Sequence, residues 1–319
     1  MKRYVGIDLG GTNLKLGLVS AEGEILNRLS SPTEADRGPD HVLGRMAAAV
    51  RDLCREAGIG VADVAAVGVG SPGPLDSKAG MVVFAPNLPG WRNVPVRDRL
   101  GKDLDRTVVL ENDANAAAYG EFRCGAGRDV SDMVLLTLGT GVGGGIVLGG
   151  RLLRGVSDSG AELGHMIILH RGRRCGCGNR GCLEAYASAT AVVGRTREAL
   201  EAGRPSRLSA DGLDCKAVFD AAAAGDALAR TIVEETAEYL GIGITTILHV
   251  LNPQRVVLTG GMMGAGDAFL ESVRRHVRET AFEQAWRACE IRWSTLGGDA
   301  GILGTALAAE AFDRTGQPA

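Results

Sequence analysis

Two stretches of the chain share one pattern, in which alternating hydrophobic and polar residues are interrupted by a glycine-rich turn. Residues 4–19 read YVGIDLGGTNLKLGLV, which predicts a strand, a tight turn at residues 10–12 and a second strand. Residues 133–149 read MVLLTLGTGVGGGIVLG and predict the same plan around a turn at residues 139–141. We therefore expect two related α/β domains, each of which opens with such a hairpin.

The hydrophobic pattern elsewhere predicts helices alternating with strands. In chain order we expect a helix over about 38–57, strands over 64–70 and 107–111, a helix from Asn112 to Phe122, a long helix over 226–251, a strand over Arg255–Thr259, a helix over 267–280, a strand near 290–294 and an Ala-rich helix over 300–312. The segment 201–214 has no clear pattern and is expected to be a surface loop. We expect the closing helix to return to the first domain. The expected bounds are thus 1–112 plus 300–319 for the N-terminal α/β domain and 113–299 for the C-terminal one.

Composition narrows the class of protein. A chain of 319 residues that is 45% hydrophobic can form two domains with sizeable cores. Its net charge of −3 and the lack of a long basic block argue against a nucleic-acid partner. No signal-like apolar region follows Met1, and no apolar run approaches the length of a membrane span. We expect a cytoplasmic protein with no membrane partner.

The cysteines fall into two groups. Cys54, Cys124, Cys215 and Cys289 are scattered, and an odd total of seven fits a reducing compartment without a disulfide framework. The other three lie in the stretch ELGHMIILHRGRRCGCGNRGCLE, residues 162–184.

That stretch contains a candidate metal site. The thiolates of Cys175, Cys177 and Cys182 together with the imidazole of His165 form a complete tetrahedral set for a structural Zn²⁺. The alternative is a loop with free thiols, or a disulfide between Cys175 and Cys177. A zinc ion would hold His165 and the two flanking carboxylates, Glu162 and Glu184, on one wall of a pocket.

The two glycine turns are candidates for phosphate binding, because bare backbone N–H groups and a hydroxyl suit phosphate oxygens. A single Gly-Gly turn is weak evidence, since hairpins commonly use one, but two matched turns can hold a phosphate chain from both sides. Asp8 directly precedes the first turn, where its carboxylate could hold Mg²⁺ through water. A third glycine pair, Gly260-Gly261, follows the strand expected over Arg255–Thr259. It could accept adenosine, or it could be an ordinary strand-to-helix turn. The residues expected at the nucleotide are Asp8, Gly10, Gly11, Thr12, Gly139, Thr140, Gly141, Gly260 and Gly261.

Asp113 is the candidate catalytic base. It follows a buried strand and lies in the first turn of an Ala-rich helix, where the helix dipole stabilises a carboxylate. Asn112 and Asp113 could instead be only an N-cap and a first-turn acid. Beside two nucleotide turns, however, a carboxylate that accepts a hydroxyl proton fits phosphoryl transfer to an alcohol.

The surrounding polar residues suit a ligand with many hydroxyl groups, because each buried hydroxyl needs a partner. Gly73 and Asn87, in loops of the first domain, could complete the opposite wall, although plain turn chemistry also explains them. The expected substrate-binding residues are Gly73, Asn87, Asn112, Asp113, Glu162, His165 and Glu184.

These motifs together resemble the sugar kinases of the ROK (repressor, open reading frame, kinase) family, and within it the bacterial ATP-dependent glucokinases. The matching motifs are IDLGGT at 7–12, ENDANAAAYGE at 111–121, LGTGVGGG at 138–145, ELGH at 162–165, CGCGNRGCLE at 175–184 and LTGG at 258–261. The resemblance implies an actin-like ATPase (ribonuclease H-like) fold, with two α/β domains around a hinged cleft. It also implies ATP with Mg²⁺, Asp113 as general base, sugar contacts from residues 112, 113, 162, 165 and 184, and zinc on His165 and the three cysteines.

Other functions are weighed against phosphorylation of glucose to glucose 6-phosphate. Kinases for N-acetylmannosamine, N-acetylglucosamine, allose or fructose share most of this pocket, so the preferred hexose stays open. A sugar-sensing transcriptional regulator is disfavoured, because no basic recognition helix precedes the first strand. A non-enzymatic zinc module leaves both hairpins and Asp113 unexplained. We expect a homo-oligomer, either a dimer or a tetramer.

Overall fold

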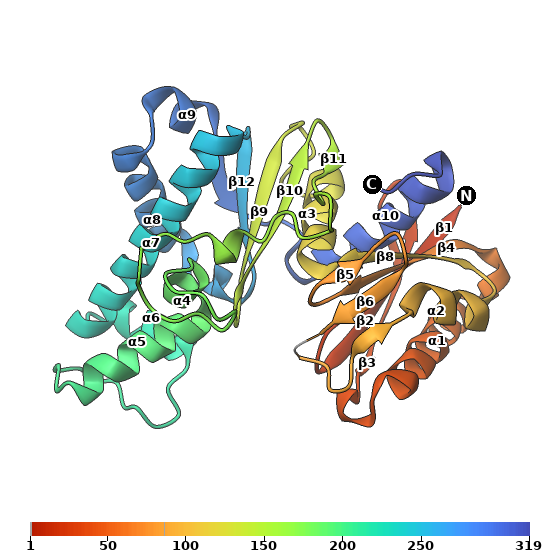
Figure 1. Ribbon diagram of the computed structural model, residues 1–319, viewed down its shortest axis with the longest axis horizontal. Helices are drawn as coiled ribbons and strands as arrows, with labels where there is room; N and C mark the ends of the chain where they lie inside the picture. The colour runs from red at the N-terminus through yellow and green to blue at the C-terminus, as the bar shows by residue number, and fades with distance from the viewer. Residues whose placement is uncertain (1, 86) are drawn as a thin grey trace. The chain divides into compact units, whose positions relative to one another are not determined.

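The computed structural model describes residues 2–85 and 87–319, and the chain forms two compact units (Figure 1). The first unit consists of Met1–Ser131, Gly145–Ala161 and Thr295–Ala319. The second consists of Asp132–Gly144 and Glu162–Ser294. In the described part of the chain no helix has the length and apolar character needed to cross a membrane.

The first unit is built on a five-stranded sheet of order β3-β2-β1-β4-β8. Its strands are β1 (Arg3–Leu9), β2 (Asn13–Ser20), β3 (Ile25–Pro32), β4 (Val64–Ser71) and β8 (Thr107–Asn112). Strands β1, β2 and β3 are antiparallel, whereas β4 and β8 run parallel to β1. The unit also contains a small sheet of β5 (Leu75–Asp76), β6 (Met81–Phe84) and β7 (Arg92–Val94), and the short β11 (Arg151–Leu152).

Helices cover both faces of the first sheet (Figure 1). Helices α1 (Pro39–Glu56) and α2 (Val96–Leu104) pack on one face, against a core that includes Val5 and Ile7. Helices α3 (Asp113–Cys124) and α10 (Ala300–Thr315) pack on the other. Successive side chains of a strand point to opposite faces, so Gly6 and Asp8 lie on the face of α10.

Glycines allow α10 to approach the sheet closely. A Cβ added at Gly6 would overlap the carbonyl oxygen of Ile302, and one added at Gly68 would overlap that of Thr305. The same holds between helices, where a Cβ at Gly304 would overlap the carbonyl oxygen of Ala116 in α3. The expected return of the closing helix to the first sheet is therefore confirmed.

The second five-stranded sheet repeats the strand order of the first, as β11-β10-β9-β12-β13. Its strands besides β11 are β9 (Met133–Leu138), β10 (Val142–Leu148), β12 (Arg255–Thr259) and β13 (Glu290–Trp293), and the chain passes from the second unit to the first within β10. Asp8 pairs with Gly70 on a parallel neighbour of β1, and Thr137 pairs with Thr259 on a parallel neighbour of β9. The expected repeat of the hairpin plan is confirmed, and in it Thr137 takes the position of Asp8.

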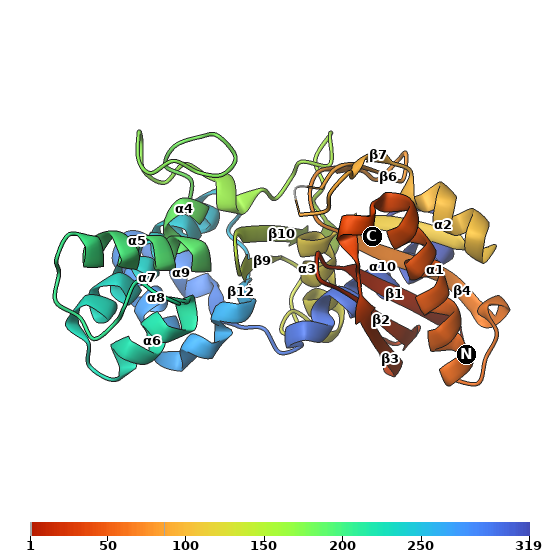
Figure 2. The same cartoon turned by 90° about the horizontal axis from the view of Figure 1, so that it is seen from below.

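The remaining helices belong to the second unit. They are α4 (Glu184–Ala187), α5 (Ala189–Glu201), α6 (Cys215–Ala223), α7 (Ala227–Leu251), α8 (Gly266–Thr280) and α9 (Glu283–Ala288). Helices α5, α6 and α7 pack against one another, and α8 lies along α7 (Figure 1 and Figure 2).

The long elements agree with the sequence pattern, and residues 202–214 form a loop as expected. The pattern missed β3, the small sheet and helices α2, α4, α5, α6 and α9. The compact units also have other bounds than the expected domains. Helix α3, expected in the C-terminal domain, belongs to the first unit because its Gly120 packs against the backbone of Ala300 in α10.

Candidate active site

The first glycine turn joins β1 to β2, and two hydrogen bonds from Thr33 stabilise it. The Thr33 hydroxyl donates to the carbonyl oxygen of Gly10 at 2.6 Å, and its backbone N–H donates to that of Thr12 at 2.8 Å. Gly11 and Thr12 are exposed. The turn therefore presents backbone to solvent while the carbonyl groups of Gly10 and Thr12 are satisfied, an arrangement that suits phosphate oxygens.

Asp8 lies at the end of β1, beside the first turn of α10. A Cβ added at Gly301 would lie 3.3 Å from the carboxylate carbon of Asp8. Burial raises the pKa of Asp8, and the charge of Lys15 on the paired strand opposes this rise. The carboxylate thus lies close to a helix N-terminus, which favours its charged form.

Asn112 and Asp113 occupy the turn from β8 into α3. The Asn112 side-chain oxygen accepts hydrogen bonds from the N–H groups of Ala114, at 2.9 Å, and Asn115, at 3.1 Å. Asn112 is therefore the N-cap that the sequence allowed, and its side-chain N–H₂ group is not used in this capping.

Asp113 combines an accessible side chain with a raised pKa. The residue is exposed, and its Oδ1 accepts a hydrogen bond from the N–H of Ala114 at 2.9 Å. The protein mass around the carboxylate reduces its hydration and raises the pKa of Asp113 to about 6, and the charge of Asp8 adds to this rise. The hydrogen bond from Ala114 acts in the opposite direction. A base with a pKa near neutrality suits proton transfer at physiological pH.

A buried ion pair lies directly behind this turn and was missed from the sequence. The Glu111 carboxylate accepts hydrogen bonds from the Arg154 guanidinium, from the N–H of Asn112 at 3.0 Å and from the side chain of Asn115 at 3.2 Å. Only the buried position of Glu111 at the end of a predicted strand hinted at such a partner.

Gly73 and Asn87, the two loop residues predicted to bind the sugar, occupy different surroundings. Gly73 has a φ of +82°, and a Cβ there would overlap the carbonyl oxygen of Phe84, so the turn itself requires glycine. Asn87 is exposed and lies beside the first glycine turn, because a Cβ added at Gly11 would be 3.3 Å from its carbonyl oxygen. The structure thus places Asn87 beside the first glycine turn.

The second glycine turn joins β9 to β10. Its Gly139 N–H donates to the carbonyl oxygen of Gly141 at 3.0 Å. The hydroxyl of Thr137, which precedes the turn, accepts from the N–H of Gly143 at 3.0 Å. Thr137 therefore stabilises the turn and is a further residue that the alignment of the two hairpins could have identified.

The third glycine pair lies next to this turn. Gly260 has a φ of +98°, and a Cβ there would be 2.5 Å from the carbonyl oxygen of Leu138 at the end of β9. A Cβ at Gly261 would meet nothing within 4 Å. Gly260 is thus required by the backbone, while Gly261 leaves open space that a ligand could occupy.

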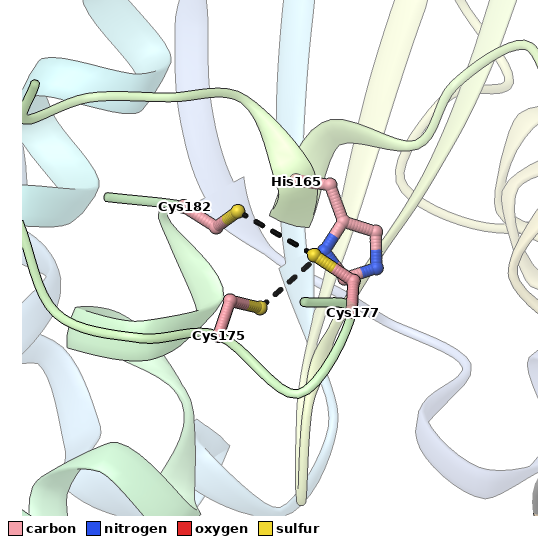
Figure 3. A group of neighbouring side chains, drawn as sticks. All are labelled: His165, Cys175, Cys177 and Cys182. Atoms are coloured by element: carbon pink, nitrogen blue, oxygen red, sulfur yellow. Dashed lines mark hydrogen bonds between the residues drawn. The ribbon is translucent and has the colours of Figure 1, made fainter. Parts of the chain in front are cut away.

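The cysteines and histidine of residues 165–182 converge on one point (Figure 3). Their four ligand atoms all lie within 4.8 Å of one another. The Sγ atoms of Cys177 and Cys182 are 3.7 Å apart, as are the Sγ of Cys175 and the Nδ1 of His165. Zn–S bonds of about 2.3 Å in a tetrahedron place two sulfurs about 3.8 Å apart. The donor set therefore fits zinc in both chemistry and spacing.

The thiols of this cluster have shifted pKa values. Burial raises the pKa of the Cys175 thiol to about 12 and also raises that of Cys182, whereas the backbone N–H of Asn179 lowers the pKa of Cys177. None of the seven cysteines forms a disulfide within the described residues.

The three predicted sugar ligands of the second unit adjoin this cluster. The Nε2 of His165, the ring nitrogen away from Cys175, lies 3.9 Å from a carboxylate oxygen of Glu162. Glu184 accepts a hydrogen bond from the N–H of Val142 at 3.0 Å, and its other oxygen lies 3.5 Å from the Sγ of Cys175. Glu162, His165 and Glu184 therefore lie at or beside the cysteine cluster.

Comparison with known proteins identifies the family. The chain matches the ROK family over residues 4–311. It belongs to the ROK family. A glucokinase of Thermotoga maritima is 40% identical to this ROK chain over 309 residues, which cover 95% of this chain and 96% of the relative.

Solved structures of family members share the fold. The ROK hexokinase from Thermus thermophilus aligns with a TM-score of 0.86 at 38% identity, covering 98% of this chain and 99% of that one. A ROK family glucokinase from Streptomyces griseus, solved in complex with glucose and AMPPNP, aligns with a TM-score of 0.80 at 35% identity, covering 97% and 99%. The expected actin-like ATPase fold is thereby confirmed.

Proposed function

We propose that this ROK chain is a glucokinase that transfers the γ-phosphoryl group of ATP to the 6-hydroxyl of glucose. The observation that carries the proposal is the position of Asp113, which is exposed at the start of α3 and whose pKa the surrounding protein raises to about 6. The glucokinase relatives and the complex of one such enzyme with glucose and AMPPNP support the choice of substrates.

In the proposed reaction Asp113 acts as general base. Its carboxylate accepts the proton of the sugar hydroxyl while the hydroxyl oxygen forms a bond to the γ-phosphorus. The bond between that phosphorus and the bridging oxygen of ADP breaks, and ADP leaves with the bond's electron pair. Phosphoryl transfer needs positioning more than covalent chemistry, and the Asn112 cap fixes the backbone on which Asp113 is carried.

The two glycine turns are proposed to hold the phosphate groups of ATP. Their residues are the exposed backbone at Gly11 and Thr12 and the turn from Gly139 to Gly141. Asp8 would hold Mg²⁺ through water, and the metal would neutralise charge on the phosphate oxygens. Gly261, with open space beside it, is proposed to lie under the adenosine.

Sugar recognition is proposed for the side chains of Asn112, Asp113, Glu162, His165 and Glu184, together with the loop residues Gly73 and Asn87. Zinc bound by His165, Cys175, Cys177 and Cys182 would fix the ring of His165 and order the loop that ends beside Glu184.

The test is ADP release by the purified chain with Mg-ATP and a panel of hexoses. We expect the largest kcat/KM for glucose, with lower values for N-acetylmannosamine, N-acetylglucosamine, allose and fructose. A larger kcat/KM for another sugar would assign the chain to that sugar. ADP release that no sugar stimulates would remove the proposed kinase activity.

A further inference from the structure

We propose that Glu184 positions the second glycine turn as well as the sugar, so that a single carboxylate connects the two substrates. The inference rests on the proposed function and extends it. Glu184 Oε2 accepts a hydrogen bond from the backbone N–H of Val142 at 3.0 Å. Val142 is buried and directly follows the turn, as the first residue of β10.

The carboxylate also occupies the space beside the turn. A Cβ added at Gly141 would overlap Glu184 Oε2, whereas a Cβ added at Gly139 would meet nothing within 4 Å. The two glycines of one turn therefore have different reasons to lack a side chain. Gly141 leaves room for Glu184, whereas Gly139 borders open space.

The segment that follows Glu184 supports the rest of the turn. The N–H of Ala189 donates to the carbonyl oxygen of Gly139 at 2.8 Å, and the hydroxyl of Thr190 donates to that of Thr140 at 2.8 Å. Each residue of the turn, or its immediate neighbour, thus contacts residues 184–190. Displacement of Glu184 removes the charged member of this set of contacts.

The other carboxylate oxygen links the turn to the cysteine cluster. Glu184 Oε1 lies 3.5 Å from the Sγ of Cys175. The side chain is therefore held between the cluster and the turn. A sugar hydroxyl that donates to this carboxylate shares it with the N–H of Val142, so sugar binding and the geometry of the phosphate turn depend on one group.

The first experiment measures nucleotide binding without sugar, by calorimetric titration of AMPPNP with Mg²⁺. Glu184→Ala should weaken this binding on the order of tenfold, the effect of losing a hydrogen bond to a charged group. The control is Glu162→Ala, because the Glu162 carboxylate lies near the ring of His165 and, among the described residues, is not one of the groups that contact the turn. It should weaken glucose binding only. If Glu184→Ala bound AMPPNP as tightly as the parent, Glu184 would be a sugar ligand alone.

The second experiment is the reciprocal one, and it decides the question even if Glu184→Ala does not fold. Glucose is titrated into Gly141→Ala and Gly139→Ala in the absence of nucleotide. Gly141→Ala should weaken glucose binding several-fold by displacing Glu184, while Gly139→Ala should keep the parent's affinity. Equal glucose affinities in the two variants would overturn the inference. A parent protein that binds no glucose would instead count against the proposed function.

Discussion

Glu111 and Arg154 form a buried ion pair, and Glu111 lies two residues before Asp113 along the chain. Their side chains are 2% and 14% exposed. Glu111 Oε2 accepts from Arg154 Nε at 2.9 Å, and Glu111 Oε1 accepts from the N–H of Asn112 at 3.0 Å. The pair therefore fixes the backbone that carries the proposed base.

Removing one member of this pair should lower the free energy of unfolding. Arg154→Met leaves the Glu111 carboxylate buried without its cation, so we expect a loss of about 3–5 kcal/mol in the free energy of unfolding. Urea denaturation followed by circular dichroism measures it. Arg151→Met is the control, because Arg151 is exposed and should change stability by less than about 0.5 kcal/mol. Equal midpoints for the two variants would show that the ion pair adds nothing.

Asp113→Asn tests the general base. The amide cannot accept the hydroxyl proton, so kcat should fall by about 10²–10⁴ while glucose still binds. Stopped assays of ADP release give kcat, and calorimetry gives the glucose affinity. Near-normal turnover by a folded Asp113→Asn protein would exclude this role.

The pH dependence of kcat/KM should report the raised pKa of Asp113. A general base must be ionised, so activity should be low below the pKa of about 6, rise through it and level off above it. Because the charge of Asp8 contributes to this raised pKa, Asp8→Asn should move the rising limb to lower pH. A limb near pH 4, the ordinary range for aspartate, would mean that the surroundings do not raise the pKa as described.

Loss of the metal should affect the sugar more than the nucleotide. Cys177→Ser should lose about one zinc ion per chain and weaken glucose binding severely, because His165 loses its fixed ring orientation. Elemental analysis and calorimetry with glucose and AMPPNP measure both effects. Cys215→Ser, outside the cluster, should keep its zinc. If a zinc-free variant bound glucose as tightly as the parent, the metal would stabilise only its own loop and would have no effect on sugar binding.

Two glycines test the packing of α10. Gly68→Ala places a Cβ on the carbonyl oxygen of Thr305 and should destabilise the protein by about 1–3 kcal/mol. Gly44 is exposed inside α1 with nothing within 4 Å of an added Cβ, so Gly44→Ala should stabilise it by about 0.5–1 kcal/mol. Thermal unfolding should give a lower melting temperature for Gly68→Ala and a higher one for Gly44→Ala than for the parent. Melting temperatures that change in the same direction would contradict this interpretation of the α10 interface.

The sequence pattern predicted those helices and strands that are long enough for their own residues to show a recognisable hydrophobic pattern. Strand β12 was predicted at Arg255–Thr259 because four successive apolar or β-branched residues, from Val256 to Thr259, are followed by a glycine pair, and the structure has the same bounds. The small sheet was missed because β5 has only two residues and β7 three. Periodicity over so few positions cannot be recognised.

The candidate site was predicted to the extent that it lies in local motifs. His165 and the three cysteines could be grouped because metal-ligand chemistry limits their spacing. The pair of Glu111 and Arg154 joins residues 43 apart, and the hydrogen bond from Val142 to Glu184 joins residues 42 apart. Neither contact has a local signature, since a charged side chain or a backbone N–H can find many partners.

The position of α10 also has a consequence for synthesis of the chain. The ribosome completes β1 and β4 long before it reaches residue 300, and at about 5–20 residues per second the interval is on the order of tens of seconds. Throughout that time the part of the sheet face that α10 covers lacks this helix. The nascent protein therefore exposes apolar side chains such as Tyr4 and Ala66 and the bare backbone at Gly68, a surface to which a chaperone can bind until translation of the last helix.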